Sequence, residues 1–403
     1  MHIVIIGAGE CGVRAALALR EQGFEGSIDL VNGELHAPYE RPPLSKPGDD
    51  GLIAKPVSGS EHLADKGITL HSGITATKID RGTKQIVLSD GVVLPYDRLL
   101  LALGARPRRL AIDGQDVPNV HYLRHFEDAE IIHRSIESGK RVTIIGGGFI
   151  GLELAAVARQ KGTVVTILEA APRLLGRAVP AEIAAIIEAR HRAKGVQVLC
   201  GTSITSIDAQ GRILLGDGTQ ITSDAIIVGI GSLSNIDLAL DSGLDIDNGI
   251  AVDGRLQTSD PSIYAAGDCC SFPHPLYGGR RIRIESWRAA QEQGDHAARA
   301  MLGSSDLYDA VPWFWSDQYD LTLQIAGMSG DAKKTVRRAI DDTALILFHL
   351  DQDGRLLAAS GIGPGNAIAR DIRIAEMLIA KRAHPEEGSL ANPALKLKAL
   401  LAA

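Results

Sequence analysis

Two stretches of this chain repeat one pattern of apolar and polar positions. Residues 3–6 and 142–145 are short apolar runs that contain Ile and Val, and a glycine-rich turn follows each run. Beyond each turn, Ala and Leu recur three and four positions apart among polar residues. The apolar run predicts a buried strand, and the three-to-four spacing predicts an amphipathic helix. The chain therefore contains two copies of a strand-turn-helix unit.

Both turns have the spacing Gly-x-Gly-x-x-Gly. The glycines are Gly7, Gly9 and Gly12 in the first turn and Gly146, Gly148 and Gly151 in the second. The first glycine of such a turn permits a tight bend, the second lets the backbone approach a pyrophosphate, and the third lets the helix pack against the strand. The N-terminus of the helix then faces the phosphates. Two such units predict two dinucleotide sites.

The residue that ends the next strand distinguishes the two sites. After the second turn, the segment TVVTILE finishes at Glu169, where a carboxylate can bind the 2′-hydroxyl of an adenosine ribose and repel a 2′-phosphate. This site is predicted to prefer NAD to NADP, although Arg173 follows four residues later and could weaken the preference. In the first copy the carboxylate comes slightly late, at Glu34, after Asn32 and Gly33.

Composition narrows the class of protein. The chain has 403 residues, 45% of them hydrophobic, which is enough for two or three domains. Its 44 glycines and 4% aromatic residues suit repeated strand-turn-helix units. The formal net charge of −7 disfavours nucleic acid as the main partner. No apolar run approaches the roughly 18 residues that span a bilayer, and we expect no leader peptide at the first residues. We expect a cytoplasmic α/β protein that binds neither nucleic acid nor membrane.

The segment IYAAGDCCSF raises the question of whether its cysteines or its Asp carry chemistry. Cys11, Cys200, Cys269 and Cys270 have neither a disulfide-scaffold nor a metal-site spacing. Adjacent cysteines form a relaxed disulfide only with difficulty, so Cys269 and Cys270 are predicted to fill space. Two dinucleotide sites imply FAD and a nicotinamide cofactor, and a flavin needs acceptors for its ribityl hydroxyls. Asp268, after small residues, is the predicted acceptor.

Several further segments together resemble one protein family. They are YERPPLSK (39–46), LLLALGARPR (99–108), GGGFIGLELA (146–155), AAGDC (265–269), ESW (285–287) and PWFWSDQYDLTLQIAG (312–327). In this order they resemble the NADH-dependent ferredoxin reductases of Rieske oxygenase and cytochrome P450 systems. The resemblance covers nearly the whole chain, and its RPPLSK and PWFWSDQ segments are more specific than the glycine turns.

The resemblance implies a glutathione-reductase-like α/β fold with two Rossmann-type dinucleotide-binding domains and an α+β C-terminal domain. The FAD-binding domain is expected over residues 1–110 and 234–311, the NAD-binding domain over 111–233, and the C-terminal reductase domain over 312–403. Gly, Pro and polar residues near the first two boundaries favour crossings between domains there.

The resemblance also implies roles for individual residues. Lys46 resembles a lysine beside the flavin N5 edge and Glu153 an acid near the nicotinamide, and these are the predicted catalytic residues. Trp315 resembles an aromatic near the exposed side of the flavin, although its sequence position also suits an ordinary core tryptophan. The full set of expected FAD contacts is Gly7, Gly9, Cys11, Gly12, Glu34, Arg41, Lys46, Ala76, Arg124, Asp268, Trp287 and Trp315, and the expected NAD contacts are Gly146, Gly148, Ile150, Gly151, Glu153 and Glu169.

The expected activity follows from a missing cysteine pair. Disulfide reductases of this fold carry such a pair on the helix of the first glycine turn, and this chain has none there. The flavin is therefore expected to pass electrons singly to a [2Fe-2S] ferredoxin that feeds an oxygenase. Two alternatives stay open: the same fold with rubredoxin, a quinone or oxygen as acceptor, and a flavoprotein scaffold similar to apoptosis-inducing factor. Monomer and weak homodimer are both expected states.

Two basic clusters are candidates for docking an acidic ferredoxin. The first contains Arg280, Arg281, Arg283 and Arg288 around Trp287, and the second contains Lys333, Lys334, Arg337 and Arg338. The second cluster fits equally well as a solvated strand edge that discourages aggregation.

Overall fold

The computed structural model describes residues 1–48, 51–176 and 179–402. Its chain forms two compact units. Unit 1 comprises Met1–Arg41, Ala54–Arg106 and Leu233–Pro312, and unit 2 comprises Pro42–Ile53, Pro107–Ser232 and Trp313–Ala403. The chain thus changes unit close to the predicted crossings near 110, 234 and 312. Residues 42–48 and 51–53, expected in the FAD-binding domain, belong to the second unit. The division into three domains stays a prediction.

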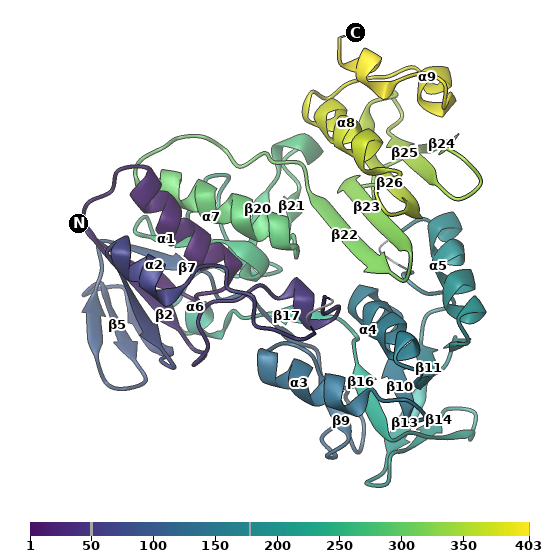
Figure 1. Cartoon of the computed structure of the whole chain (residues 1–403). Helices are drawn as coiled ribbons and strands as arrows, with labels where there is room; N and C mark the ends of the chain where they lie inside the picture. The colour runs from purple at the N-terminus through teal and green to yellow at the C-terminus, as the bar shows by residue number, and fades with distance from the viewer. Residues whose placement is uncertain (49–50, 177–178, 403) are drawn as a thin grey trace. The chain divides into compact units, whose positions relative to one another are not determined.

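Unit 1 is built on a parallel sheet in the order β19-β7-β1-β2-β3. Figure 1 labels two of its strands, β7 and β2. These strands are β1 (His2–Ile6), β2 (Ser27–Asn32), β3 (Ile68–Ser72), β7 (Arg98–Leu101) and β19 (Ile263–Ala265). The apolar residues of β1 are buried because this strand lies in the middle of the sheet, as the apolar run predicts. The helices α1 (Glu10–Glu21) and α7 (Trp287–Met301) pack against each other.

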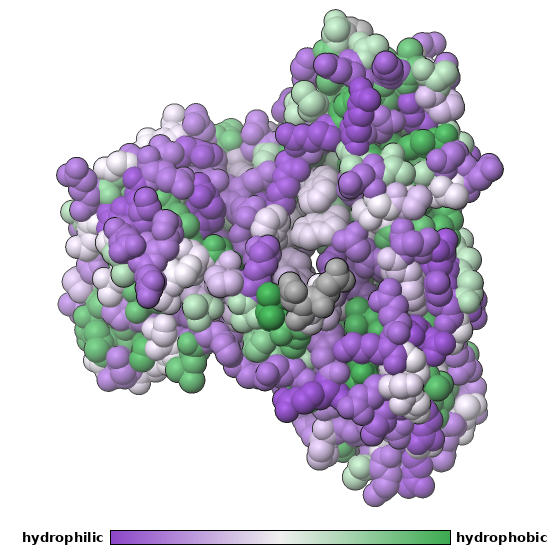
Figure 2. All heavy atoms as spheres, viewed as in Figure 1, coloured by the Kyte–Doolittle hydropathy of each residue, from purple (hydrophilic) through white to green (hydrophobic). Residues whose placement is uncertain are grey.

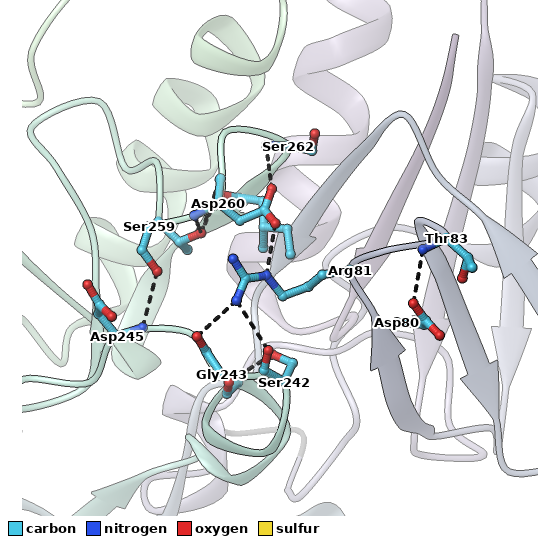
Figure 3. Close-up of polar contacts among 12 residues, drawn as sticks. Asp80, Arg81, Thr83, Ser242, Gly243, Asp245, Ser259, Asp260 and Ser262 are labelled. Atoms are coloured by element: carbon cyan, nitrogen blue, oxygen red, sulfur yellow. Dashed lines mark hydrogen bonds and ion pairs between the residues drawn. The ribbon is translucent and has the colours of Figure 1, made fainter.

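Smaller elements complete unit 1. They are α2 (Ser60–Asp65), α6 (Asp237–Asp241), the antiparallel strands β4 (Ala76–Asp80), β5 (Gln85–Leu88) and β6 (Val93–Pro95), and a second group of strands, β18 (Ile250–Ala251), β20 (Cys270–Pro273) and β21 (Arg281–Ile282). Arg81 follows β4 and fastens this hairpin to the segment after α6. Its guanidinium donates to Asp260 at 2.9 Å and to the carbonyl of Gly243 at 2.9 Å (Figure 3).

Unit 2 contains a second parallel sheet in the order β12-β11-β10-β16-β9. Its strands are β9 (Val120–Tyr122), β10 (Arg141–Ile145), β11 (Val164–Glu169), β12 (Gln197–Cys200) and β16 (Ala225–Val228), and its helices are α3 (Phe126–Ser135), α4 (Phe149–Gln160) and α5 (Ala181–Ala193). A small antiparallel sheet of β13 (Ile204–Ile207), β14 (Arg212–Leu215) and β15 (Gln220–Thr222) follows. β8 (Ala105–Pro107) and β17 (Ser232–Ser234) lie where the chain passes from one unit to the other.

The C-terminal part of unit 2 is an antiparallel sheet in the order β22-β23-β26-β25-β24. Its strands are β22 (Trp313–Gln318), β23 (Leu321–Gly327), β24 (Lys334–Ala339), β25 (Leu345–Leu350) and β26 (Leu356–Pro364), with α8 (Ala369–Ala380) and α9 (Glu387–Ala391) after them. Leu321, Leu323 and Leu347 of this sheet share one buried core with Ile144 and Ile183 of the parallel-sheet part. The C-terminal sheet is therefore packed directly against the second glycine-turn unit.

On the face drawn in Figure 2, hydrophilic residues predominate and apolar residues gather only in small separate groups. Among the helices of the described residues, none combines the length and apolar character that crossing a membrane requires.

Candidate active site

The first glycine turn in unit 1 has no room for larger residues at two of its three glycines. Gly7 has φ +105°, and a Cβ there would lie 2.2 Å from the carbonyl oxygen of Ala102. A Cβ on Gly12 would lie 1.8 Å from the carbonyl oxygen of Gly7. Gly9, at the start of α1, has open space on its side-chain face. A tight turn, a close helix and an open backbone at the middle glycine are what a pyrophosphate needs.

The second glycine turn in unit 2 repeats this geometry. Gly146 has φ +107°, and a Cβ there would lie 2.3 Å from the carbonyl oxygen of Gly229. A Cβ on Gly151 would lie 2.4 Å from the carbonyl oxygen of Gly146, whereas Gly148 meets only one atom, at 3.8 Å. Ile150, the second residue of α4, lies beside this turn and is 49% exposed. Both turns thus suit a dinucleotide for the same steric reasons.

Glu169 lies against the second glycine turn. Its Oε2 accepts from the backbone N–H of Gly147 at 2.7 Å, and its Oε1 accepts from that of Ala171 at 2.7 Å. The Arg173 guanidinium donates to backbone carbonyls of its own loop, including that of Gly176 at 2.8 Å. Its hydrogen bonds are therefore directed to the loop and not to a nucleotide phosphate. The two backbone N–H groups fix the Glu169 carboxylate at the turn.

Glu34 is also brought to its glycine turn, despite its late position. The Tyr39 hydroxyl donates to Glu34 Oε2 at 2.5 Å, and the Arg41 guanidinium donates to Glu34 Oε1 at 2.7 Å. The three residues line a small pocket that also includes Ala8, Gly9, Asn32, His36, Ala37 and Pro38. The pocket opens where β2 ends beside the turn, which is the place expected for an adenosine.

Helix α7 brings Trp287 to the start of α1. The Ser286 side chain caps α7 by accepting from the N–H of Ala289, which fixes where the helix begins. Trp287 and Gln291 lie one turn apart on one face. The Trp287 indole N–H donates to Glu10 Oε2 at 2.9 Å, and the Gln291 amide donates to Glu10 Oε1 at 2.7 Å. Burial raises the pKa of Glu10.

The close approach of these two helices depends on one glycine. A Cβ on Gly294 of α7 would lie 2.5 Å from the carbonyl oxygen of Cys11 on α1. The Asp268 segment is tied to the same helix, because the N–H of Gly267 donates to Gln293 at 2.7 Å. Asp268 itself is half-buried, and its carbonyl accepts from the Ser234 hydroxyl at 3.1 Å. Trp287 and Asp268 are therefore both held near the first glycine turn.

The cysteines of unit 1 are buried free thiols. Cys11, Cys269 and Cys270 are all buried and form no disulfide. Burial raises the pKa of Cys269 to about 11 and raises those of the other two as well. A reactive cysteine needs an accessible thiolate. These thiols are protonated and enclosed, which supports the predicted space-filling role.

In unit 2 a charged cluster forms around Lys46. The Lys46 ammonium lies 3.2 Å from Glu153 Oε1 and 3.4 Å from Asp317 Oδ2. Glu153, on α4, is only 7% exposed. Its carboxylate also accepts from the hydroxyls of Ser45, at 2.6 Å, and Ser316, at 2.7 Å. Burial of a carboxylate requires such partners. The two predicted catalytic residues are thus in direct contact.

The segment that carries Lys46 is anchored to α3. Its Pro42–Leu44 stretch forms a single 3-10 turn, and the ring N–H of His133 donates to the carbonyl of Leu44 at 2.8 Å. Burial lowers the pKa of His133, so the ring stays neutral. This contact joins the Pro42–Leu44 turn to unit 2, as the contacts of Ser45 and Lys46 with Glu153 do.

Trp315 is a member of the Lys46 cluster and is only half-buried, so it is not an ordinary core tryptophan. The Lys46 ammonium lies 4.9 Å from the centre of its ring, within the range of a cation–π contact. Trp313 stacks on it with ring centroids 5.4 Å apart. Its indole N–H donates to Asp317 Oδ2 at 3.1 Å.

Two expected FAD contacts, Ala76 and Arg124, lie outside the groups described above. Ala76 is the half-buried first residue of β4. Arg124 precedes α3, and its backbone N–H donates to Asp128 at 3.0 Å. Their roles stay predictions.

Sequence reasoning missed four residues that hold the expected ones in place, namely Glu10, Ser45, Ser316 and Asp317. Three of them carried a weak signal in their spacing. Glu10 is a charged residue inside a glycine turn, Ser45 precedes Lys46, and Asp317 lies two positions after Trp315 on the same strand face.

The basic clusters are less free than the sequence suggests. In the first, Arg283 pairs with Glu285, Arg288 pairs with Glu292, and Arg281 donates to the carbonyl of Ser271. In the second, the expectation of a solvated edge is wrong for Arg338, which is 3% exposed. Its guanidinium donates to the carbonyls of Asn392 and Leu395, both at 2.7 Å, and so anchors the C-terminal segment to the edge strand β24.

Comparison with known proteins places this geometry in a family. The family model described as Pyridine nucleotide-disulphide oxidoreductase matches residues 1–294, and the model described as Reductase C-terminal matches residues 313–401. The chain belongs to the pyridine nucleotide-disulphide oxidoreductase family. Membership confirms the predicted fold class, two Rossmann-type units followed by a separate C-terminal sheet.

Individual relatives are similar in sequence to this chain over almost its whole length. The ferredoxin--NAD(+) reductase component of an anthranilate 1,2-dioxygenase system from Burkholderia cepacia is 40% identical, with 99% of this chain and 98% of the relative covered. Putidaredoxin reductase CamA of Pseudomonas putida is 38% identical, with 100% and 97% covered. The reductase of a covalent putidaredoxin reductase-putidaredoxin complex has a TM-score of 0.93 at 36% identity, with 100% and 98% covered.

These relatives confirm the predicted resemblance to NADH-dependent ferredoxin reductases. They also confirm the enzyme class, an oxidoreductase whose cofactors are FAD and NAD(H). The two glycine turns fit these cofactors sterically, because each leaves its middle glycine open and excludes side chains at the other two.

Proposed function

We propose that this protein is an NADH-dependent reductase that passes electrons singly to a small [2Fe-2S] ferredoxin serving an oxygenase. The observation that carries the proposal is the pair of equivalent glycine turns, one in each unit, with Glu153, the ion-pair partner of Lys46, two residues after the second turn. Full-length similarity to reductase components of oxygenase systems supports the choice of acceptor.

FAD and NAD(H), when bound, supply the redox chemistry: hydride is accepted from NADH and electrons leave one at a time. The residues of the chain bind and orient these groups. We assign the FAD pyrophosphate to the turn of Gly7, Gly9 and Gly12, with Glu34 and Arg41 toward the adenosine and Asp268 toward the ribityl chain. We assign NADH to the turn of Gly146, Gly148 and Gly151.

Glu169 gives the NADH site its selectivity in this proposal. Its carboxylate is held at the turn by two backbone N–H groups and leaves a negative charge where a 2′-phosphate would arrive. The nearby arginine would be the natural partner of that phosphate, but Arg173 donates to its own loop. We therefore expect a clear preference for NADH over NADPH.

Lys46 and Glu153 act through charge and position. An ammonium held near a group that gains negative charge stabilises it without reorganisation. Glu153, buried and fixed by two serine hydroxyls, holds that ammonium in one place. We assign Lys46 to the flavin side of the site and Glu153 to the nicotinamide side.

The absence of a sulfur relay supports an external one-electron acceptor. Every cysteine in the described residues is a free thiol, and the three in unit 1 are buried with raised pKa values. None of these three meets the requirements of an exchange-active thiolate. Electrons therefore leave without passing through a disulfide.

The acceptor is tested by steady-state turnover of the FAD-loaded enzyme with NADH and a panel of acceptors. We expect fast reduction of a [2Fe-2S] ferredoxin, followed through cytochrome c, and slow reduction of oxygen. Faster turnover with rubredoxin, a quinone or oxygen would replace the ferredoxin assignment. Flavin that NADH reduces only slowly would favour a scaffold role instead.

We further infer that the enzyme works in the cytoplasm as a monomer or weak homodimer, without nucleic acid or membrane partners. The net charge of −7 supports the lack of a nucleic-acid partner. Sedimentation of the FAD-loaded protein over a range of concentrations tests the oligomeric state, and a stable dimer at low concentration would contradict it.

A further inference from the structure

Strand β22 presents Trp315 and Asp317 on one face, because successive side chains of a strand alternate and these residues are two positions apart. Ser316 lies between them on the other face, where it is buried and donates to Glu153. Side chains from both faces of β22 therefore contact members of the Lys46 cluster. One face anchors Glu153, and the other carries the tryptophan and the second carboxylate.

Asp317 connects three groups of this cluster. Its Oδ2 accepts from the Trp315 indole N–H at 3.1 Å and lies 3.4 Å from the Lys46 ammonium. Its Oδ1 accepts from the hydroxyl of Thr322 at 2.8 Å. Thr322 is the direct cross-strand partner of Asp317 in the β22–β23 pair. The strand register therefore positions the Asp317 carboxylate through Thr322, independently of its contacts with Trp315 and Lys46.

An indole has a single hydrogen-bond donor, so the bond to Asp317 selects one of the two broad orientations of the ring. In this orientation the ring face meets the Lys46 ammonium at 4.9 Å and stacks on Trp313. The same carboxylate gives Lys46 a second anionic partner beside Glu153. Loss of Asp317 would remove this hydrogen bond from the indole and leave the ammonium with one carboxylate of the two.

The two carboxylates differ in exposure. Glu153 is 7% exposed and Asp317 is 47% exposed. An exposed ion pair adds little to global stability. The contribution of Asp317 is therefore to geometry at the site, and its substitution is not expected to unfold the protein.

We propose that Asp317 is a positioning residue that holds the Trp315 indole and the Lys46 ammonium in one arrangement. The proposal rests on the proposed function, since it matters to turnover only if Lys46 and Trp315 serve the bound cofactors. Asp317 acts through these two side chains.

Asp317→Ala and Asp317→Asn test the proposal, with Asp320→Asn as the matched control. Asp320 lies on the same hairpin and pairs with Arg190, away from Trp315. The first readout is the emission of Trp315, obtained by subtracting the spectrum of Trp315→Phe. We expect Asp317→Ala to shift this emission to the red and to increase its quenching by iodide. Asp317→Asn, which keeps an acceptor oxygen, is expected to restore most of the emission.

The second readout is the rate of flavin reduction by NADH in single turnover. Both Asp317 variants should slow it by roughly threefold to tenfold, because a displaced ammonium loses its alignment. Asp320→Asn should change neither readout. Unchanged Trp315 emission and unchanged reduction in Asp317→Ala, with a melting temperature near that of the wild type, would overturn the proposal. If the wild-type protein fails to reduce ferredoxin while Asp317→Ala still shifts the Trp315 emission, the result would defeat the proposed function alone.

Discussion

Each unit of the molecule fastens one tryptophan of the expected site through a carboxylate, and the two solutions differ in charge. In unit 1, Trp287 donates to Glu10, whose other oxygen takes the amide of Gln291. In unit 2, Trp315 donates to Asp317, which also pairs with Lys46. Glu10 therefore accepts hydrogen bonds from two neutral side chains, whereas Asp317 forms an ion pair with the Lys46 ammonium.

This difference shows what each carboxylate can do. Burial raises the pKa of Glu10 despite its hydrogen bonds to Gln291 and Trp287, so its negative charge is costly and its role is to hold a ring. The carboxylates around Lys46 set the position of a positive charge, which is the group that can act on a reaction. Unit 1 is thus organised for binding and the Lys46 cluster in unit 2 for electrostatics.

The largest expected effect separates the two glycine turns. Gly12→Ala places a Cβ 1.8 Å from the carbonyl of Gly7 and should destabilise unit 1 by about 1–3 kcal/mol and abolish FAD retention. Gly151→Ala, with a 2.4 Å clash, should leave the yellow colour and weaken NADH binding. Absorbance at the flavin band and NADH titration measure both. Gly59→Ala, with open space and φ −66°, is the control. The reverse pattern of losses would exchange the two assignments.

The next effect concerns charge near the second turn. Glu153→Gln removes the buried partner of Lys46 and should slow flavin reduction by NADH about 10-fold to 100-fold, while FAD stays bound. Stopped-flow bleaching of the flavin measures this rate. Glu182→Gln is the control, because Glu182 pairs with Arg337 on the surface of the same unit. Equal rates in the two variants would remove Glu153 from the catalytic set.

The two acids that follow the glycine turns give a third comparison. Glu169→Gln should raise the ratio of kcat/KM for NADPH to that for NADH by roughly tenfold, because the repulsion of a 2′-phosphate is removed. Glu34→Gln should lower FAD retention and leave that ratio unchanged. Steady-state kinetics with both nucleotides tests the pair. A change of the ratio in the Glu34 variant would show that the two sites are misassigned.

The smallest effect is the pH dependence of Glu10. Because its pKa is raised in the folded protein, its protonated form is the stabilised one. Its contribution is fully present below the unfolded pKa and is lost as pH rises through the folded pKa. Glu10→Gln should therefore gain stability over the wild type as pH rises from about 4 to 7, by less than about 1 kcal/mol because the group is partly exposed. Thermal melts across this range measure it, and a gain that shrinks with pH would contradict the assignment.

Much of the fold follows from local patterns in the sequence. The strands and helices of both glycine-turn units were predictable because their glycines are fixed by contacts a few residues away, such as that between Gly12 and Gly7. Glu169 was predictable for the same reason, since it ends a strand beside its turn. The spacing of apolar residues also predicted which strands would be buried.

The partners of the site residues were harder to predict, because they come from distant segments. Glu153 meets Ser45 and Ser316, which lie 108 and 163 residues away along the chain. Arg338 looked like part of a solvated edge, yet it is buried by a C-terminal segment whose carbonyls it binds. No local pattern encodes such contacts.

The central claim is that electrons leave the flavin without a sulfur relay, and an anaerobic titration of the FAD-loaded enzyme with NADH tests it most directly. The cysteines that the structure describes form no disulfide, so we predict that the flavin is fully bleached and uptake stops at about one NADH per FAD. Uptake of about two NADH per FAD would reveal a second two-electron acceptor in the protein and contradict the account.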